Sequence, residues 1–349
     1  MRSARLILAR AVFAACLGVI LTGCIAPSAP RLTRISGESL VFIGEQPSPL
    51  AFPPAGDAPF VLRGAVAPGG VAYAEGKDFA LDRAAGTVRR LPGSRLPDFR
   101  TNVLHGLEEF DHTRHPGFGN RPFLAYADYV PATPPRWPVQ PPQSHLLARS
   151  RTRLAAGGPF RIIAFGDSIT AGADVSAPEN VYWRRWAEAL QVKYPRAAIT
   201  AIDAATGGDT TTRGLERLRA KVLEASPDLV LVAFGMNDHN RRGVAPDVFE
   251  RQLGEIIARI RAATSAEIVL LSAFPPNPRW IHGSGRMEAY AGATARAAVA
   301  ASCAYADVFG NWQALAGRKR PEDLLANNIN HPSDFGHWIY FRVLSEMDL

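Results

Sequence analysis

The sequence predicts an α/β fold, with a parallel sheet covered by helices on both faces, preceded by a smaller β-rich, sandwich-like region. Three observations support this. After Arg149, apolar runs rich in Val, Ile and Leu alternate with helical stretches, as in a sheet buried on both faces. Residues 35–129 are turn-rich and contain short alternating runs. Six prolines in residues 130–143 separate the two regions.

Residues 1–23 have the pattern of a secretory signal peptide. An arginine-containing start precedes an apolar run, Ala11 to Leu21, that is too short to span a membrane. The ending Leu-Thr-Gly-Cys resembles the lipobox of bacterial lipoproteins, in which Cys24 becomes the lipidated first residue. The alternative is an ordinary signal peptide with a chance cysteine. By the same resemblance, Ile25 favours anchoring to the outer membrane, so we expect a cell-envelope location, with residues 24–36 as a tether.

Charge and cysteine content restrict the partners. The net charge of +7 falls to +4 when the three arginines of residues 1–23 are removed. This mildly basic remainder does not predict nucleic-acid binding. Once Cys16 leaves with the signal peptide and Cys24 carries lipid, Cys303 remains. No intramolecular disulfide is then expected, and Cys303 is interpreted as a buried, inert thiol.

The β-rich region is assigned to residues 37–130. Its stretch "DRAAGTV" carries a glycine between two alternating runs, which is typical of a hairpin. The proline-rich residues 131–149 are assigned as an extended linker or a strap, because proline cannot donate to a sheet.

Residues 150–349 are assigned to the α/β domain. Its expected strands are "FRIIAFG", "AITAIDAA", "DLVLVAFG", "AEIVLLSAF" and a short "YADVFG". Helices are expected near Val181–Lys193, Thr211–Glu224, Pro246–Ala263, Gly285–Ala301 and Ser333–Leu344. Active sites in such folds lie at the carboxyl ends of the strands.

Polar residues follow several of these strand ends. Ser168 follows the first strand, Gly208 the second and Asn237 the third, and His331 comes near the C-terminus. Acyl transfer needs such a set: a nucleophile, a base and donors for a tetrahedral oxygen. Taken alone, Ser168 could equally be a helix N-cap.

Four blocks, "GDSIT", "GGDTT", "GMND" and "NHP", resemble those of the SGNH, or GDSL-type, hydrolases, and they stand in the family order over residues 161–349. The resemblance implies that Ser168 is the nucleophile and His331 the general base. It also implies an oxyanion hole made by the N–H groups of Ser168 and Gly208 and the side-chain amide of Asn237. The family fold is a three-layer α/β/α domain, its activities are esterase, lipase, thioesterase and carbohydrate deacetylase, and it needs no metal or organic cofactor.

One position departs from the family pattern. The usual aspartate three residues before the histidine is replaced by Asn328. An asparagine carbonyl can accept the Nδ1 hydrogen of His331, but it supplies no charge. Three possibilities follow: Asn328 orients His331, a backbone carbonyl or an acid such as Asp323 or Asp334 does so, or the site binds without turnover.

Other candidates have a structural and a functional interpretation. The stretch "DHTRH", with Asp111, His112 and His115, is interpreted as a structural loop rather than a metal site. Trp183 and Trp186 share one helix face, which favours core packing over a sugar-stacking surface. Two further histidines were considered, His239 as a pocket-lining residue and His337 as a core or capping residue.

The resulting hypothesis is an extracytoplasmic lipoprotein esterase that works through an acyl-enzyme. The expected substrate is a short-chain O-acyl or O-acetyl ester on a small molecule or a polysaccharide, and the expected membrane contact is the lipid at Cys24. A lipase or thioesterase is the alternative within the same fold. A non-catalytic surface protein whose β-rich region binds a glycan or a partner is the alternative from another class.

Overall fold

The computed structural model describes residues 34–66 and 70–349, which form one compact unit. The expected signal peptide, Cys24 and most of the expected tether lie outside the described residues. Within the described part of the chain, no helix has both the length and the apolar character to cross a membrane.

The α/β domain is built on a five-stranded parallel sheet with the order β12-β11-β10-β8-β9. Val230 of the central strand pairs with Ile163 on one side and Ile268 on the other, and all three are buried. The predicted parallel sheet is thereby confirmed. Its strands are β8 (Gly158–Gly166), β9 (Ala197–Asp203), β10 (Leu229–Ala233), β11 (Glu267–Leu271) and β12 (Ala304–Ala306).

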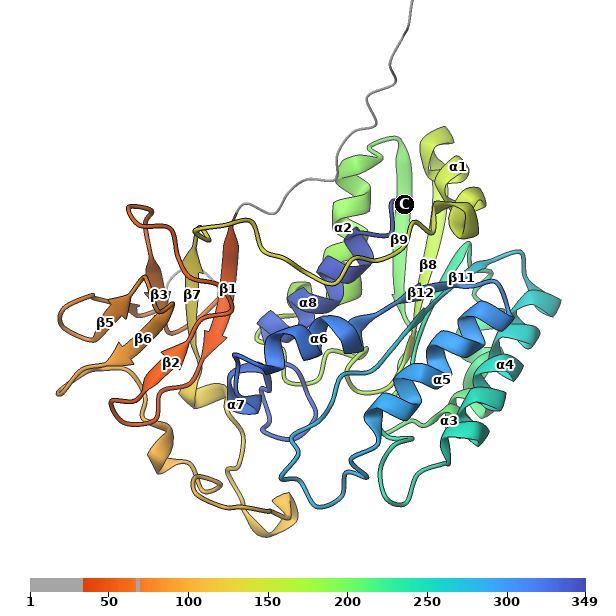
Figure 1. Cartoon of the computed structure of the whole chain (residues 1–349). Helices are drawn as coiled ribbons and strands as arrows, with labels where there is room; N and C mark the ends of the chain where they lie inside the picture. The colour runs from red at the N-terminus through yellow and green to blue at the C-terminus, as the bar shows by residue number, and fades with distance from the viewer. Residues whose placement is uncertain (1–33, 67–69) are drawn as a thin grey trace, which may run out of the picture. The chain divides into compact units, whose positions relative to one another are not determined.

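Helices cover both faces of this sheet, as predicted. Helices α3, α4 and α5 lie on one face, and α2, α6 and α8 lie on the other (Figure 1). Helix α8 begins after Ser333, whose Oγ accepts the N–H of Gly336 at 3.3 Å. The helices are α1 (Ala148–Ala156), α2 (Tyr182–Lys193), α3 (Thr211–Leu218), α4 (Pro246–Ala263), α5 (Met287–Ala300), α6 (Val308–Ala316), α7 (Pro321–Leu324) and α8 (Asp334–Ser345).

The N-terminal region consists of two antiparallel sheets, which confirms its β-rich character. Gly86, with φ of 65°, turns the predicted hairpin between β5 and β6. The ring of Phe60 contacts Phe79 of one sheet and Tyr129 of the other. The first sheet contains, in order, β1 (Ile35–Leu40), β7 (Ala125–Tyr129), β3 (Val61–Arg63) and β4 (Ala72–Tyr73). The second sheet contains β2 (Pro47–Pro49), β6 (Thr87–Arg90) and β5 (Phe79–Asp82).

The proline-rich segment is a strap that packs on the α/β domain. Gln143 pairs with the backbone of Tyr305 in β12 through two hydrogen bonds of 2.6 and 2.8 Å. The ring of Trp137 lies 5.9 Å from that of Trp338 in α8. One hydrophobic cluster extends through the β-rich region and the α/β domain, so the two share a core.

Candidate active site

Ser168 lies at the carboxyl edge of the parallel sheet, two residues after β8 ends. A Cβ at Gly166 would lie only 2.4 Å from the carbonyl oxygen of Ala233, so the chain can turn here only with glycine. The Asp167 carboxylate then accepts the N–H two residues ahead at 3.0 Å. This turn leaves Ser168 half-buried.

The Ser168 hydroxyl meets an imidazole that is held by a carboxylate. His331 Nε2 lies 2.9 Å from Ser168 Oγ, and His331 Nδ1 lies 2.5 Å from Asp174 Oδ2. Because an ionised carboxylate only accepts, Nδ1 donates to Asp174, which leaves Nε2 able to accept the serine hydrogen. The hydrogen bond from His331 holds the pKa of Asp174 below its usual value, although partial burial opposes this effect.

Asp174 reaches His331 because the chain after the serine turns sharply. Gly172 has φ of 81° and Asp174 has φ of 64°, a left-handed conformation in which aspartate is enriched among non-glycine residues. Just beyond the turn, the N–H of Ser176 donates to Asp334 Oδ1 at 3.0 Å. This hydrogen bond attaches the segment to the first residue of α8, which follows His331 closely in the sequence.

The prediction that Asn328 orients His331 is wrong. Asn328 Nδ2 donates to the carbonyl of Phe118 at 2.7 Å, and its Oδ1 has no hydrogen-bond partner among the described residues. The physical reason lies in the loop. Asn327 Oδ1 accepts the N–H of His331 and of the two residues before it, each at 2.9 Å, while Asn328 has φ of 61°. The side chain of Asn328 is therefore directed to Phe118.

The two other acids considered from the sequence are engaged elsewhere. Asp323 Oδ1 accepts the N–H of Val41 at 2.8 Å, and Asp334 Oδ1 accepts that of Ser176. The acid that contacts His331 is Asp174, for which no sequence block made a prediction. Its only signal is its place six residues after Ser168, within "DSITAGAD".

The loop that carries the expected oxyanion donor Gly208 lies beside the serine. A Cβ at Gly207 would lie 3.9 Å from the Cβ of Ser168, and Gly208 has φ of 78° with open space where a Cβ would point. Asn237 Nδ2 donates to the carbonyl of Asp209 at 2.9 Å, which places the amide next to these glycines. Among the described residues, the N–H groups of Ser168 and Gly208 have no protein acceptor, as expected for groups that receive a substrate oxygen.

Asp238 joins the two loops that carry these donors. Its Oδ1 accepts the N–H and the hydroxyl of Thr211 at 2.8 and 2.6 Å, and its Oδ2 accepts the N–H of Gly235 at 3.1 Å. Because Asp238 is fully buried, these bonds fix the loop after β9 against the loop after β10.

Asp167 is buried next to the nucleophile, and burial raises its pKa to about 7, with the charges of Asp238 and Asp209 adding to the effect. In the unfolded chain the same carboxyl ionises near pH 3.9. The stability that its protonated form contributes is therefore complete below about pH 4 and is lost as the pH rises through about 7.

We expect Asp167→Asn to remove this loss, since the asparagine oxygen can still accept the N–H of Ile169. The Tm of Asp167→Asn minus that of the wild type should increase by at least about 3 °C between pH 5 and pH 8. Asp247→Asn, at an exposed carboxylate, is the control and should show no such increase. A difference for Asp167→Asn that stays constant with pH would contradict the argument.

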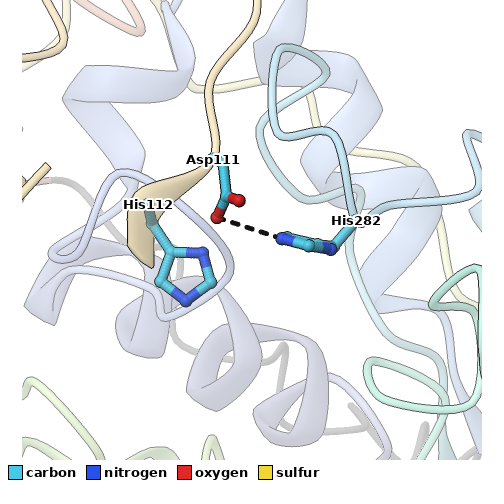
Figure 2. Close-up of side chains that lie close together, drawn as sticks. All are labelled: Asp111, His112 and His282. Carbon is cyan, nitrogen blue, oxygen red and sulfur yellow. Dashed lines mark hydrogen bonds and ion pairs between the residues drawn. The ribbon is translucent and has the colours of Figure 1, made fainter. Parts of the chain in front are cut away.

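Asp111, His112 and His282 form a separate cluster whose ligand atoms lie within 4.8 Å of one another (Figure 2). His282 Nε2 donates to Asp111 Oδ1 at 3.1 Å, and the Trp280 indole N–H donates to His112 Nδ1 at 3.0 Å. A neutral imidazole has one free lone pair, and the Trp280 bond uses it on His112. The cluster therefore fits a hydrogen-bonded contact between two loops better than a metal site. The third member is His282, and His115 is not part of the cluster.

The remaining candidates lie in the interior. Trp183 and Trp186 are buried, so the sugar-stacking alternative for them is wrong. His239 is also fully buried, and its Nδ1 lies 2.5 Å from the carbonyl oxygen of Met236. Burial lowers the pKa of His337 to about 3, and its ring stacks on Tyr182, as expected for a core residue.

The three side chains form a serine–histidine–aspartate site at the carboxyl edge of the sheet in a three-layer α/β/α domain. This combination defines the class of α/β proteins with a serine-hydrolase site. The model of the GDSL-like Lipase/Acylhydrolase family matches residues 164–339, half of the chain, so the chain belongs to this family.

Two curated relatives are similar over part of their length. "Esterase TesA" of Pseudomonas aeruginosa is 30% identical over 130 residues, which are 36% of this chain and 62% of that protein. "Thioesterase 1/protease 1/lysophospholipase L1" of Escherichia coli is 32% identical over 125 residues, which are 36% of this chain and 56% of that protein. The chain thus spans less than two thirds of the length of these relatives.

Two solved structures match the chain at lower identity. An acetylxylan esterase from Geobacillus stearothermophilus matches with a TM-score of 0.48 and 21% identity, over 56% of this chain and 97% of that one. A two-domain esterase active on acetylated mannans matches with a TM-score of 0.48 and 23% identity, over 58% of this chain and 52% of that one.

Proposed function

We propose that this protein is a serine esterase that hydrolyses carboxylic esters through an acyl-enzyme on Ser168. The observation that carries the proposal is the continuous contact from Ser168 Oγ to His331 Nε2 at 2.9 Å and from His331 Nδ1 to Asp174 Oδ2 at 2.5 Å. An activated hydroxyl beside unpaired N–H groups is the arrangement that acyl transfer requires.

In the first half-reaction, Ser168 Oγ attacks the ester carbonyl while its proton passes to His331 Nε2. The carbonyl oxygen becomes negative and accepts hydrogen bonds from the N–H groups of Ser168 and Gly208 and from the Asn237 amide. Asp174 stabilises the imidazolium, which then gives its proton to the leaving alcohol. The acyl group is left on Ser168.

In the second half-reaction, water attacks the acyl carbonyl and His331 Nε2 accepts its proton. The tetrahedral intermediate collapses, His331 returns the proton to Ser168 Oγ, and a carboxylic acid is released. Acylation and deacylation thus use the same base and the same donors.

The proposed substrate is a short-chain O-acyl ester, such as an acetyl group on a polysaccharide or another large alcohol. The exposed fractions of the His331 and Asp174 side chains, 19% and 36%, support this, because an accessible site can admit an ester that projects from a bulky molecule. Rates on p-nitrophenyl esters should fall as the acyl chain lengthens from acetate to palmitate. Higher rates on long chains would favour a lipase or thioesterase.

The proposed location is the cell envelope, with the lipid anchor on Cys24. The support is the signal-like residues 1–23 and the cysteine that follows them. Incorporation of labelled palmitate by the wild type, and its loss in Cys24→Ala, would test this placement.

The enzymatic proposal is tested by labelling with a serine-directed fluorophosphonate. We expect one label per chain, located by peptide mass analysis on Ser168, and labelling at least about 100-fold slower in His331→Ala, since the base activates the hydroxyl. Labelling at another serine, or equal rates in the two proteins, would contradict the proposed mechanism.

A further inference from the structure

The loop that carries His331 is closed by its own hydrogen bonds. Leu325 and Pro332 form an antiparallel bridge, and the N–H of Ala326 donates to the carbonyl of His331 at 2.9 Å. Asn327 Oδ1 accepts three successive N–H groups within the loop, including that of His331. We therefore expect the loop to move as a rigid unit. The position of His331 then depends on the contacts that this loop makes with other segments of the chain.

Asn120, from the N-terminal region, is the side chain that holds it most directly. Asn120 Nδ2 donates to the carbonyl of Glu322 at 3.0 Å and to that of Leu325 at 2.9 Å. Its backbone N–H donates to the carbonyl of Ala326 at 2.7 Å. Asn120 is fully buried, so water cannot replace these bonds at low cost.

A second link joins β1 to both ends of the same segment. Ser39 Oγ lies 2.8 Å from Ser333 Oγ and donates to the carbonyl of Asp323. The Asp323 carboxylate accepts the N–H of Val41 at 2.8 Å. The N-terminal region therefore contacts the chain on either side of His331.

A buried ion pair anchors the chain just before this segment. Lys319 Nζ lies 2.8 Å from Glu38 Oε1, and both side chains are completely buried. Lys319 also donates to the carbonyls of Ser39 and Pro49 at 2.9 and 3.0 Å. The pair fixes the register between the N-terminal region and the approach to α7, because an unpaired charge here would be very costly.

The α/β domain also binds the loop. The N–H of Asn277 donates to the carbonyl of Ile329 at 2.8 Å, and Asn277 Nδ2 donates to that of Asn328 at 2.9 Å. The loop is thus hydrogen-bonded both to Asn277, which follows β11, and to Asn120.

We infer that the N-terminal region is part of the support of the active site and that Asn120 is a positioning residue for His331. The inference rests on the proposed function, in which His331 must stay within hydrogen-bond reach of Ser168. Asn120 touches no reacting atom. It acts through its hydrogen bonds to the carbonyls of Glu322, Leu325 and Ala326. These bonds determine the position of the His331 loop relative to the edge of the sheet.

The test is Asn120→Ala, which removes two buried donors and keeps the backbone N–H. We expect kcat per active site to fall about 10- to 100-fold, with KM changed less than about threefold, because misplacing a catalytic group by about 1 Å costs this much. Active sites are counted with the fluorophosphonate. The hydrogen bond from His331 Nδ1 to Asp174 should give a far-downfield proton NMR resonance. This resonance should also shift or broaden in Asn120→Ala.

The matched control is Asn311→Ala. Asn311 is likewise a fully buried asparagine, which donates to the carbonyl of Asp307 at 2.8 Å and contacts Arg342, outside the His331 loop. It should lose thermal stability but keep kcat and the His331 resonance. Equal kcat per active site in Asn120→Ala and the wild type, whatever the change in Tm, would overturn the inference.

If Asn120→Ala does not fold, Ser39→Ala removes the two hydrogen bonds of the Ser39 hydroxyl with a smaller change in volume and leaves the bond from Val41 to Asp323 in place. It should lower kcat about threefold to tenfold, less than Asn120→Ala, because the remaining links keep His331 closer to its position. An unchanged kcat would overturn the inference. Wild-type ester hydrolysis separates the two claims. An active wild type with unaffected variants contradicts only the positioning role, whereas a wild type inactive on every ester contradicts the proposed function.

Discussion

Ser168→Ala and His331→Ala are each expected to lower kcat for ester hydrolysis about 10⁶-fold. Removing the serine removes the atom that forms the acyl-enzyme, and removing the histidine leaves that atom as a neutral hydroxyl with no acceptor for its proton. Since Ser168 Oγ and His331 Nε2 lie 2.9 Å apart and act together, the double variant should be no worse than either single variant.

The measurement is steady-state hydrolysis of p-nitrophenyl acetate by the wild type, the two single variants and the double variant. The oxyanion donors remain in all four proteins, so some activity above the uncatalysed rate should persist. Additive losses, or a Ser168→Ala variant that retains wild-type turnover, would mean that the two residues do not work as one unit.

Asp174→Asn is expected to lower kcat about 10⁴-fold, the loss seen when the acid of a serine–histidine–aspartate site becomes an amide. Asparagine supplies no charge for the imidazolium, and its NH₂ can face Nδ1 and impose the wrong tautomer. KM should change little, because the side chain acts on the histidine rather than on the substrate.

The matched control is Asn328→Gly, at the position where the family carries its acid. Glycine tolerates the φ of 61° and removes only the bond from Asn328 Nδ2 to the carbonyl of Phe118. We expect less than about a tenfold loss, the value of one buried hydrogen bond. A large loss in Asn328→Gly together with a small one in Asp174→Asn would restore residue 328 as the orienting group.

The strand-end rule predicts where Ser168 lies, whereas the link to His331 came from the family resemblance of the block "NHP". Non-alternating apolar runs identify buried parallel strands, and the carboxyl ends of such strands meet at one edge whatever the loops between them do. The placement of Gly208 and Asn237 follows from the same rule, because they lie in the loops that follow β9 and β10.

The contact between Asp174 and His331 could not be predicted from the sequence, because the position of Asp174 depends on loop geometry. Its carboxylate reaches His331 only through the left-handed turns at Gly172 and Asp174 itself. Neither interpretation of Ser168, as a nucleophile or as a helix N-cap, predicts where a side chain six residues later points. The prediction for Asn328 failed for a related reason. Its position matches that of the family's aspartate, but a matching position in the sequence does not determine which side chain contacts His331.

The contacts of the N-terminal region were beyond sequence reasoning for a different reason. Asn120 and Leu325 are far apart in the chain, and no periodicity or motif links them. The sequence predicted a β-rich region and a proline-rich connection, but it gave no indication that the two regions share one hydrophobic cluster.

The most direct test of the proposed site is the proton NMR resonance of His331 Nδ1–H, identified in protein with ¹⁵N-labelled histidine. A hydrogen bond to an ionised carboxylate moves such a proton far downfield. The signal should be present in the wild type and in Asn328→Gly and absent from Asp174→Ala. A signal that survives in Asp174→Ala and disappears in Asn328→Gly would contradict the assignment of Asp174 as the acid of this site.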